Sequence, residues 1–193
     1  KKEGKWKKNK IIIIMNLPGI YSLSPYTLEE VITRNYLIEE RPDAILNIID
    51  GTNIERNLYL STQLMELGIP VVVAVNMMDI VKKSGDQINI RKLSKLLGCE
   101  VVEISALKGM GIEEAAEKAL HLGQEKKASI NVHKFDSIVE EAIESVILKL
   151  SKEVPEEQKR FFAIKLLEKD EKIIARLKHV PDVSAVSAVI KQL

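Results

Sequence analysis

The residues with the clearest chemical use in this sequence form the short motif Asn76-x-x-Asp79. The carboxylate of Asp79 can accept two hydrogen bonds, and guanine presents a matching pair of donors in its N1–H and its 2-amino group. Adenine lacks this donor pair, so a carboxylate built to face it would be left unsatisfied, and that penalty discriminates strongly between the purines. We therefore interpret Asp79 as a candidate guanine-reading residue and Asn76 as a bridge between the base and neighbouring loops.

The position of this motif in the chain matters, because an isolated Asn-x-x-Asp is also common in capped turns. The motif directly follows the apolar run Ile69–Val75, and the tripeptide Ser105-Ala106-Leu107 directly follows the run Glu100–Ile104. Ligands of open parallel sheets bind outside the carboxyl ends of the strands, so we expect the two loops to share one rim. The backbone N–H of Ala106 can then donate to the guanine O6, and Ser105 and Leu107 complete the pocket.

A third strand-end motif, Asn16-Leu17-Pro18-Gly19, follows the run Lys10–Met15. Gly19 has no Cβ, so its backbone can approach a γ-phosphate closely. The alternative interpretation is an ordinary Pro-Gly turn. In the base loop, Met77 and Met78 lie between Asn76 and Asp79, and for Met78 we favour a packing role in the core.

These motifs need a scaffold that brings strand ends together, and the sequence predicts an open α/β fold with a mostly parallel sheet. Nearly unbroken β-branched runs are typical of strands covered on both faces. They are Lys10–Met15, Ala44–Asp50, Ile69–Val75 and Glu100–Ile104. Helical patterns alternate with these runs, as expected for an α/β fold. Two of them open with a capping box: Thr27–Glu40, with Thr27 and Glu30, and a helix from Thr52 and Glu55 to Leu67. The other two are Ile90–Leu97 and Glu113–Leu122, which ends before Gly123.

The pattern changes after about residue 123, which indicates a second domain. A polar, linker-like stretch covers residues 124–132. Further helices are expected over Asp136–Leu150, from Pro155 through Leu167, over Asp170–Leu177 and over Val183–Ile190. We therefore predict an α/β domain over residues 1–123 and a small helical domain over residues 131–193.

Composition excludes several classes of function. The chain has 193 residues, of which 46% are hydrophobic and 30% charged, as in ordinary folded domains. A net charge of +1 gives no general attraction for nucleic acid, so we expect no nucleic-acid partner. No apolar run approaches the ~20 residues that a membrane helix needs, so we expect this chain alone to be soluble. The single cysteine, Cys99, excludes an intramolecular disulfide, and the three histidines lack metal-ligand spacing.

Several of these motifs together resemble the GTP-binding domain of bacterial ferrous iron transport protein B. The similar segments are Asn76-Met77-Met78-Asp79, Ser105-Ala106-Leu107, Leu17–Tyr26 and Asn53–Leu60. Methionine at position 77, where most translational-type GTPases carry lysine, is typical of this family. The likeness covers residues 1–123 closely, whereas residues 131–193 resemble the following helical domain by position and helicity rather than by motif.

This resemblance implies a fold, ligands and partners. It implies a P-loop NTPase fold of the GTPase type, GTP or GDP as the ligand, and Mg²⁺ held through water near residue 16. It also implies a regulatory role in Fe(II) uptake at the cytoplasmic face of the cell membrane, beside a membrane permease domain of the same protein. Within such a switch, Gly19 would sense the γ-phosphate and residues 20–35 would move and signal to the helical domain.

Three departures from the family pattern bear on activity. No G-x-x-x-x-G-K-S/T motif occurs in the sequence, although that loop normally holds the phosphates and Mg²⁺. Asn16 replaces the family's aspartate and lacks the charge that a hard cation prefers. Ile20, an apolar position shared with the family, stands where fast GTPases carry a water-orienting glutamine, which implies slow hydrolysis. We expect little or no GTP hydrolysis by this chain.

The likeness begins just downstream of the expected phosphate loop, so we expect the chain to be a fragment. The family's first strand lies mid-sheet, between the strands at 11–15 and 44–50. Without it, either the sheet has a gap or these two strands pair directly.

Two other functions remain open from the sequence. The first is a non-catalytic α/β interaction module that has lost nucleotide binding and whose helical part docks a partner. The second is an unrelated α/β enzyme that merely shares the same strand-end turns.

Overall fold

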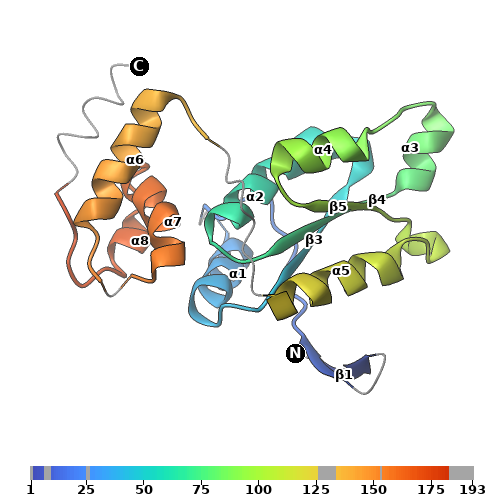
Figure 1. Cartoon of the computed structure of the whole chain (residues 1–193), viewed down its shortest axis with the longest axis horizontal. Coiled ribbons are helices and arrows are strands. Elements are labelled where there is room, and N and C mark those ends of the chain that lie inside the picture. The colour runs from blue at the N-terminus through green and yellow to red at the C-terminus, as the bar shows by residue number, and fades with distance from the viewer. Residues whose placement is uncertain (1, 7–9, 25–26, 126–133, 153, 183–193) are drawn as a thin grey trace.

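A three-stranded parallel sheet forms the centre of the computed structural model, which describes residues 2–6, 10–24, 27–125, 134–152 and 154–182. Its strands are β3 (Ile45–Asp50), β4 (Val71–Asn76) and β5 (Glu100–Glu103), in the order β3-β4-β5 (Figure 1). Asp50 lies opposite Asn76, and Val75 lies opposite Glu103. This register brings the carboxyl ends of all three strands to the same edge.

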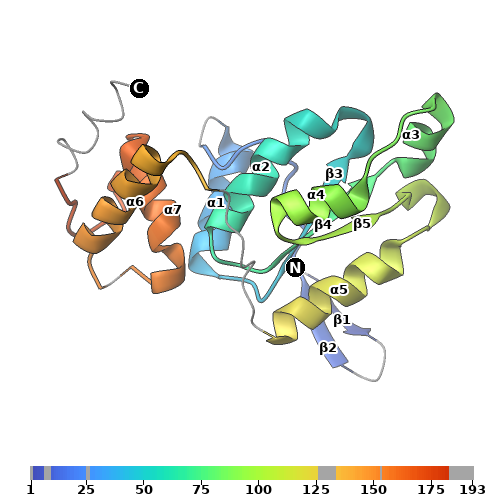
Figure 2. The ribbon, with the colours of Figure 1, turned by 45° about the horizontal axis from the view of Figure 1, so that its top comes forward.

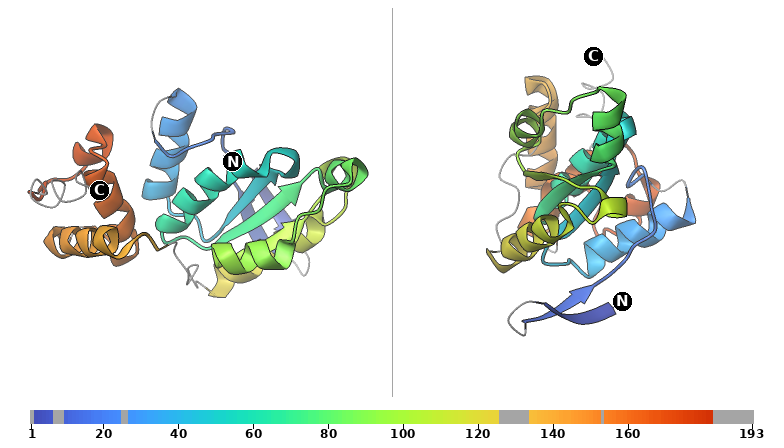
Figure 3. Two further views of the ribbon diagram at one scale, coloured as in Figure 1. Left: turned by 90° about the horizontal axis from the view of Figure 1, so that it is seen from above. Right: turned by 90° about the vertical axis from the view of Figure 1, so that its right-hand side faces the viewer.

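Helices cover both faces of this sheet, and β4 is buried between them. Every residue from Val71 to Val75 is 0% exposed, as its unbroken apolar run predicts. The odd-numbered valines of β4 pack with α2 (Ile54–Glu66) and α4 (Ile90–Leu97), whereas Val72 and Ala74 pack with α5 (Ile112–Glu125). Figure 3 shows these layers from above and from one end.

The prediction that Lys10–Met15 lies in the parallel sheet is wrong. That segment forms β2 (Lys10–Ile14), which pairs antiparallel with β1 (Lys2–Trp6) in a separate hairpin that projects from the α/β layers (Figure 2). Closing a hairpin over a short connection costs little chain entropy, so the local partner is available to β2. In the described structure β2 does not pair with β3, and it lies outside the continuous sheet β3-β4-β5. Neither expected arrangement, a gap within the sheet or direct pairing of the two strands, is therefore observed.

Two predicted helices match the structure closely. In α1 (Leu28–Glu39), Thr27 accepts a hydrogen bond from the Glu30 N–H and Glu30 accepts one from the Thr27 N–H, so the first capping box is confirmed. Helix α4 ends at Gly98, which adopts φ 70°.

Two predicted helix boundaries are wrong. The second capping box, predicted at Thr52 and Glu55, does not form. Instead the Asp50 side chain accepts a hydrogen bond from the Thr52 N–H and caps a 3₁₀ turn (Gly51–Asn53) that leads into α2. Helix α5 continues past Gly123 to Glu125. Gly123 instead packs closely on Asp43, where an added Cβ would come within 3.2 Å of the Asp43 Cβ.

The helical part begins with α6 (Ser137–Lys149), followed by α7 (Glu156–Leu167) and α8 (Glu171–Ile174) at one end of the molecule. Its apolar side chains belong to the same core cluster as those of α1 and α2, with Phe161 and Leu166 each 1% exposed. Where the helical part packs against α1, Arg34 of α1 pairs with Asp170 at 2.7 Å. The helix predicted over Val183–Ile190 and most of the predicted linker lie outside the described residues.

Candidate functional site

The loops that follow β4 and β5 lie side by side at the carboxyl edge of the sheet. The Ile104 N–H donates to the Val75 carbonyl at 2.8 Å, and the Met78 N–H donates to the Ile104 carbonyl at 3.3 Å. These bonds extend the β4–β5 pairing beyond the strands and hold residues 76–79 against residues 104–105. We call the loops 76–79 and 105–108 the carboxyl-edge rim.

A helix that the sequence analysis did not predict positions Asp79. Met77 adopts a left-handed conformation with φ 62°, and α3 (Met78–Ser84) starts directly after it. Asp79 therefore lies in the first turn of α3, where the free N–H groups of the helix favour a carboxylate. Seven residues directly after an apolar strand give too weak a periodic signal to predict a helix from sequence.

Asn76 links the two loops of the rim. Its Oδ1 accepts a hydrogen bond from the Ala106 N–H at 2.9 Å. This is the N–H that the sequence analysis assigned to the guanine O6, so in this structure Asn76 takes the place expected for the base. Ala106 itself begins a 3₁₀ turn (Ala106–Lys108) that Gly109 ends at φ 68°.

Asp79 is held as an ionised acceptor. The neighbouring Ser105 hydroxyl and then the Lys108 ammonium keep the pKa of Asp79 below its ordinary value. The buried Ser105 hydroxyl makes no hydrogen bond of ordinary geometry in the described structure, so the contact with Lys108 is the better-defined cause. The Lys108 Nζ lies 3.3 Å from Asp79 Oδ2, and the Asp79 side chain is only 16% exposed, whereas that of Lys108 is 56% exposed. At neutral pH the carboxylate can therefore accept hydrogen bonds but donate none.

Apolar side chains flank these polar groups. Met77 and Leu107 are 39% and 92% exposed, so each can contribute an apolar surface beside a planar ligand. Met78 is 4% exposed and belongs to the core cluster, so the packing role favoured for it is confirmed. A base could reach Met78 only through its backbone.

Asn16–Gly19 is not joined to the carboxyl-edge rim by any hydrogen bond or ion pair of the described residues. Leu17 packs against the core cluster, and an added Cβ at Gly19 would meet nothing within 4 Å. Asn16 is exposed and offers one neutral amide oxygen. The described residues contain no group of three or more His, Cys, Asp or Glu side chains that could hold a metal. At the expected position the protein therefore offers a single neutral oxygen in place of the carboxylate that Mg²⁺ prefers.

The described start of the expected switch segment, residues 20–24 of 20–35, is anchored to its neighbours in this structure. The buried Leu23 N–H donates to Gln63 Oε1 of α2 at 2.7 Å, and the Ser22 hydroxyl donates to the same oxygen at 3.2 Å. The Arg56 guanidinium lies 3.7 Å from the centre of the Tyr21 ring. Sequence reasoning missed Gln63 and Arg56 because their partners are 35 to 41 residues away in the chain.

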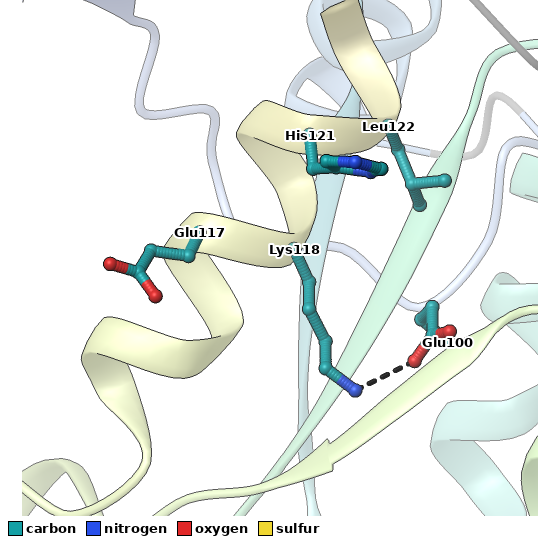
Figure 4. Close-up of a pocket in the computed structure, with 5 residues that line it drawn as sticks. All are labelled: Glu100, Glu117, Lys118, His121 and Leu122. Atoms are coloured by element: carbon teal, nitrogen blue, oxygen red, sulfur yellow. Dashed lines mark hydrogen bonds and ion pairs between the residues drawn. The ribbon is translucent and has the colours of Figure 1, made fainter. Parts of the chain in front are cut away.

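A shallow pocket elsewhere does not compete with the rim as a candidate site. It lies between α5 and the start of β5 and is lined by Glu100, Glu117, Lys118, His121 and Leu122 (Figure 4). Lys118 is already paired with Glu100 at 2.7 Å and with Glu114 at 3.4 Å. Because Glu100 opens β5, the pocket is at the amino edge of the sheet, opposite the edge where parallel sheets bind ligands.

The chain matches two family models. Residues 1–119 match the model for ferrous iron transport protein B, and residues 135–193 match the model for the FeoB cytosolic helical domain. In the described part of the chain, no helix combines the length and the apolar character needed to cross a bilayer.

Similar proteins include whole transporters and solved domains. The chain is 41% identical over 168 residues to an Fe(2+) transport protein A/Fe(2+) transporter FeoB fusion protein of Porphyromonas gingivalis and 38% identical over 167 residues to the Fe(2+) transporter FeoB of Escherichia coli. These matches cover 84% and 82% of this chain but only 20% and 21% of those proteins. The chain thus spans about a fifth of their length.

Crystal structures of NFeoB from S. thermophilus share the fold. The form bound to GDP.AlF4⁻ and K⁺ is 43% identical with a TM-score of 0.89, covering 99% of this chain and 75% of that one. The mGMPPNP-bound form is also 43% identical, with a TM-score of 0.84, covering 99% of this chain and 71% of that one.

Proposed function

Because this chain belongs to the ferrous iron transport protein B family, we propose that its carboxyl-edge rim binds the guanine base of GTP or GDP. Asp79 would accept hydrogen bonds from the guanine N1–H and 2-amino group, and Asn76 with Ser105, Ala106 and Leu107 would complete the base pocket. The observation that carries the proposal is the pairing of Asn76 with Ala106, because it holds the two loops of the rim together.

The nucleotide-bound states of the solved relatives support this ligand. NFeoB of S. thermophilus has been crystallised with mGMPPNP and with GDP.AlF4⁻ and K⁺. This chain shares that fold over 99% of its length at 43% identity. Residues 1–123 would then form the nucleotide-binding domain and residues 131–193 the helical domain.

Phosphate binding would contribute little in this chain. The Leu17 side chain packs inward and Gly19 leaves open space beside it, so Gly19 is the position at which a γ-phosphate could approach the backbone. Mg²⁺ would arrive with the phosphates it neutralises, because the neutral oxygen of Asn16 alone holds a hard cation poorly. Base recognition would therefore provide most of the binding free energy.

In the whole protein, this region would regulate Fe(II) transport at the cytoplasmic face of the membrane. Its partner would be the permease part of the same polypeptide, since the named relatives are Fe(2+) transporters of about five times this length. The interface between α1 and the helical part gives a physical route for a signal. Arg34, buried on α1, contacts Asp170, and Asp170 also caps α8 by accepting from the Lys172 and Ile173 N–H groups.

A titration with GDP and ADP tests base recognition directly. We expect GDP to shift the backbone amide NMR signals of the carboxyl-edge rim, and ADP at the same concentration to leave them unchanged. The two nucleotides carry the same phosphates, so any difference reports the base. Equal shifts with both would contradict guanine recognition, and no shift with either would favour the non-catalytic interaction module.

A further inference from the structure

In this structure, the groups that the proposed function assigns to guanine are paired with one another. The Ala106 N–H donates to Asn76 Oδ1 at 2.9 Å, and the Lys108 ammonium lies 3.3 Å from Asp79 Oδ2. A guanine base would need the Ala106 N–H for its O6 and the Asp79 carboxylate for its N1–H and 2-amino group. The base must therefore displace or share two existing interactions.

Lys108 occupies the more exchangeable of these two positions. The Asp79 carboxylate is mostly shielded at 16% exposure, while the Lys108 side chain is 56% exposed and can swing into solvent. Lys108 also ends the 3₁₀ turn that begins at Ala106, so one short segment supplies both competing contacts. Among the described residues, no other cationic side chain acts on Asp79. Lys82, which is on the same helix as Asp79, pairs with Glu103 instead.

We infer that Lys108 is an internal competitor for the guanine site, which occupies Asp79 until a base displaces its ammonium. The inference rests on the proposed function, because it assumes that Asp79 reads the guanine edge. It assigns Lys108 a role in setting the affinity and the salt dependence of base binding. An exposed ion pair contributes little, so removing the competitor tightens binding by about two- to fivefold.

Salt provides a second signature of this competition. A neutral nucleoside binds without phosphate charges, so its own affinity should depend little on ionic strength. Raising salt from about 0.1 M to about 1 M shortens the screening length from about 10 Å to about 3 Å and weakens the exposed Lys108–Asp79 pair. Guanosine should therefore bind the unmodified chain more tightly at high salt, which is opposite to the usual effect of salt on nucleotide binding.

The experiment measures guanosine binding to the unmodified chain, to Lys108→Met and to Lys82→Met by NMR titration at both salt concentrations. Lys82→Met is the matched control, because Lys82 lies on α3 beside the same rim and pairs with Glu103 rather than with Asp79. We expect Lys108→Met to bind guanosine about two- to fivefold more tightly at low salt and to lose the salt dependence. We expect Lys82→Met to behave like the unmodified chain.

A carbon-detected titration of the Asp79 carboxyl tests whether the ion pair exists in solution. If it does, Lys108→Met should raise the pKa of Asp79 toward its ordinary value. If that pKa rises while guanosine affinity stays the same or falls, Lys108 does not compete with the base and the inference is wrong. If none of the three proteins binds guanosine in preference to adenosine, the proposed function itself fails, and the competitor role fails with it.

Discussion

The polar residues of the carboxyl-edge rim stabilise one another as well as any ligand. Asn76 is the central residue, because its side chain closes the distance between the loops after β4 and β5. The left-handed Met77 directly after it turns the chain into α3 and sets the direction of Asp79. A change at Asn76 should therefore alter the folded state even without nucleotide.

Asn76→Ala tests this structural role. We expect a loss of about 1 kcal/mol in the free energy of unfolding, the usual net contribution of one hydrogen bond, together with faster hydrogen exchange at the Ala106 amide. Urea unfolding and amide exchange measure the two effects. Asn53→Ala is the control, because the Asn53 side chain makes no capping hydrogen bond before α2, and its effect should stay within about 0.5 kcal/mol. Equal losses in both variants would contradict the role of Asn76.

At the residue scale, the sequence predicted contacts between residues that lie just after the ends of strands. Asn76 lies directly after the apolar run 69–75 and Ala106 lies two residues after the run 100–104, and the structure brings them into contact. Lys108 and Gln63 were not predictable in the same way. Their roles depend on which distant side chain the fold places opposite them, and no local pattern records that partner.

Among the elements, α2, α6 and α7 meet at a shared arginine. Arg160 of α7 donates to Glu66 of α2 at 2.8 Å and pairs with Glu140 of α6 at 2.7 Å. Burial raises the pKa of Glu66 to about 7, and Arg160 only partly opposes this effect. The helical part is thus fixed to the α/β part through a carboxyl group that titrates near neutral pH.

Glu66 should make stability depend on pH. The folded pKa of Glu66, about 7, exceeds the ordinary value of 4.5, so the folded state favours the protonated carboxyl. The resulting stabilisation of the folded state is fully present below about pH 4.5 and is lost as pH rises through 7. Glu66→Gln cannot lose a proton, so relative to the unmodified chain it should gain about 1–3 kcal/mol between about pH 5 and about pH 8. Urea unfolding at each pH measures the difference.

The control for Glu66 is Glu100→Gln. Glu100 is an exposed carboxylate paired with Lys118, and exposed pairs of this kind contribute less than about 1 kcal/mol. Its difference from the unmodified chain should stay small across the same range. A Glu66→Gln difference that is constant with pH, or that shrinks as pH rises, would show that Glu66 is ionised throughout and contradict the prediction.

Element boundaries were predictable where local chemistry sets them. Thr27 and Glu30 cap α1 reciprocally, and Gly98 ends α4, because those signals act within one turn of helix. Gly123 was misread as a stop, since its real function is a close approach to Asp43, a contact that only the tertiary fold creates. The β2 segment was misassigned for a similar reason, because an apolar run predicts a strand but not the strand with which it pairs.

For the whole molecule, the two separate sheets should differ in stability. β4 is paired on both sides and is buried from Val71 to Val75, whereas β1 and β2 form a lone two-stranded hairpin with Ile13 and Ile14 more than half exposed. An isolated hairpin of two strands is marginally stable in water. Helices on both faces protect β4, and none of the described contacts gives the hairpin comparable cover.

Hydrogen exchange followed by mass spectrometry tests this difference. We expect peptides covering β4 to exchange most slowly and peptides covering β1 and β2 to exchange orders of magnitude faster, because the hairpin opens without global unfolding. Peptides from α7, which packs on the same core cluster as α2, should resemble β4 and serve as the internal reference. Equal protection of the hairpin and β4 would mean that β2 has a further partner in solution.

The most direct measurement on the guanine pocket compares guanosine with xanthosine on the unmodified chain and on Asp79→Asn. Xanthine keeps the N1–H but replaces the 2-amino donor with an oxygen acceptor, which matches the mixed acceptor and donor of an asparagine side chain. We predict that the unmodified chain prefers guanosine and that Asp79→Asn prefers xanthosine, each by about tenfold or more. Unchanged guanosine preference in Asp79→Asn would show that Asp79 does not face the base.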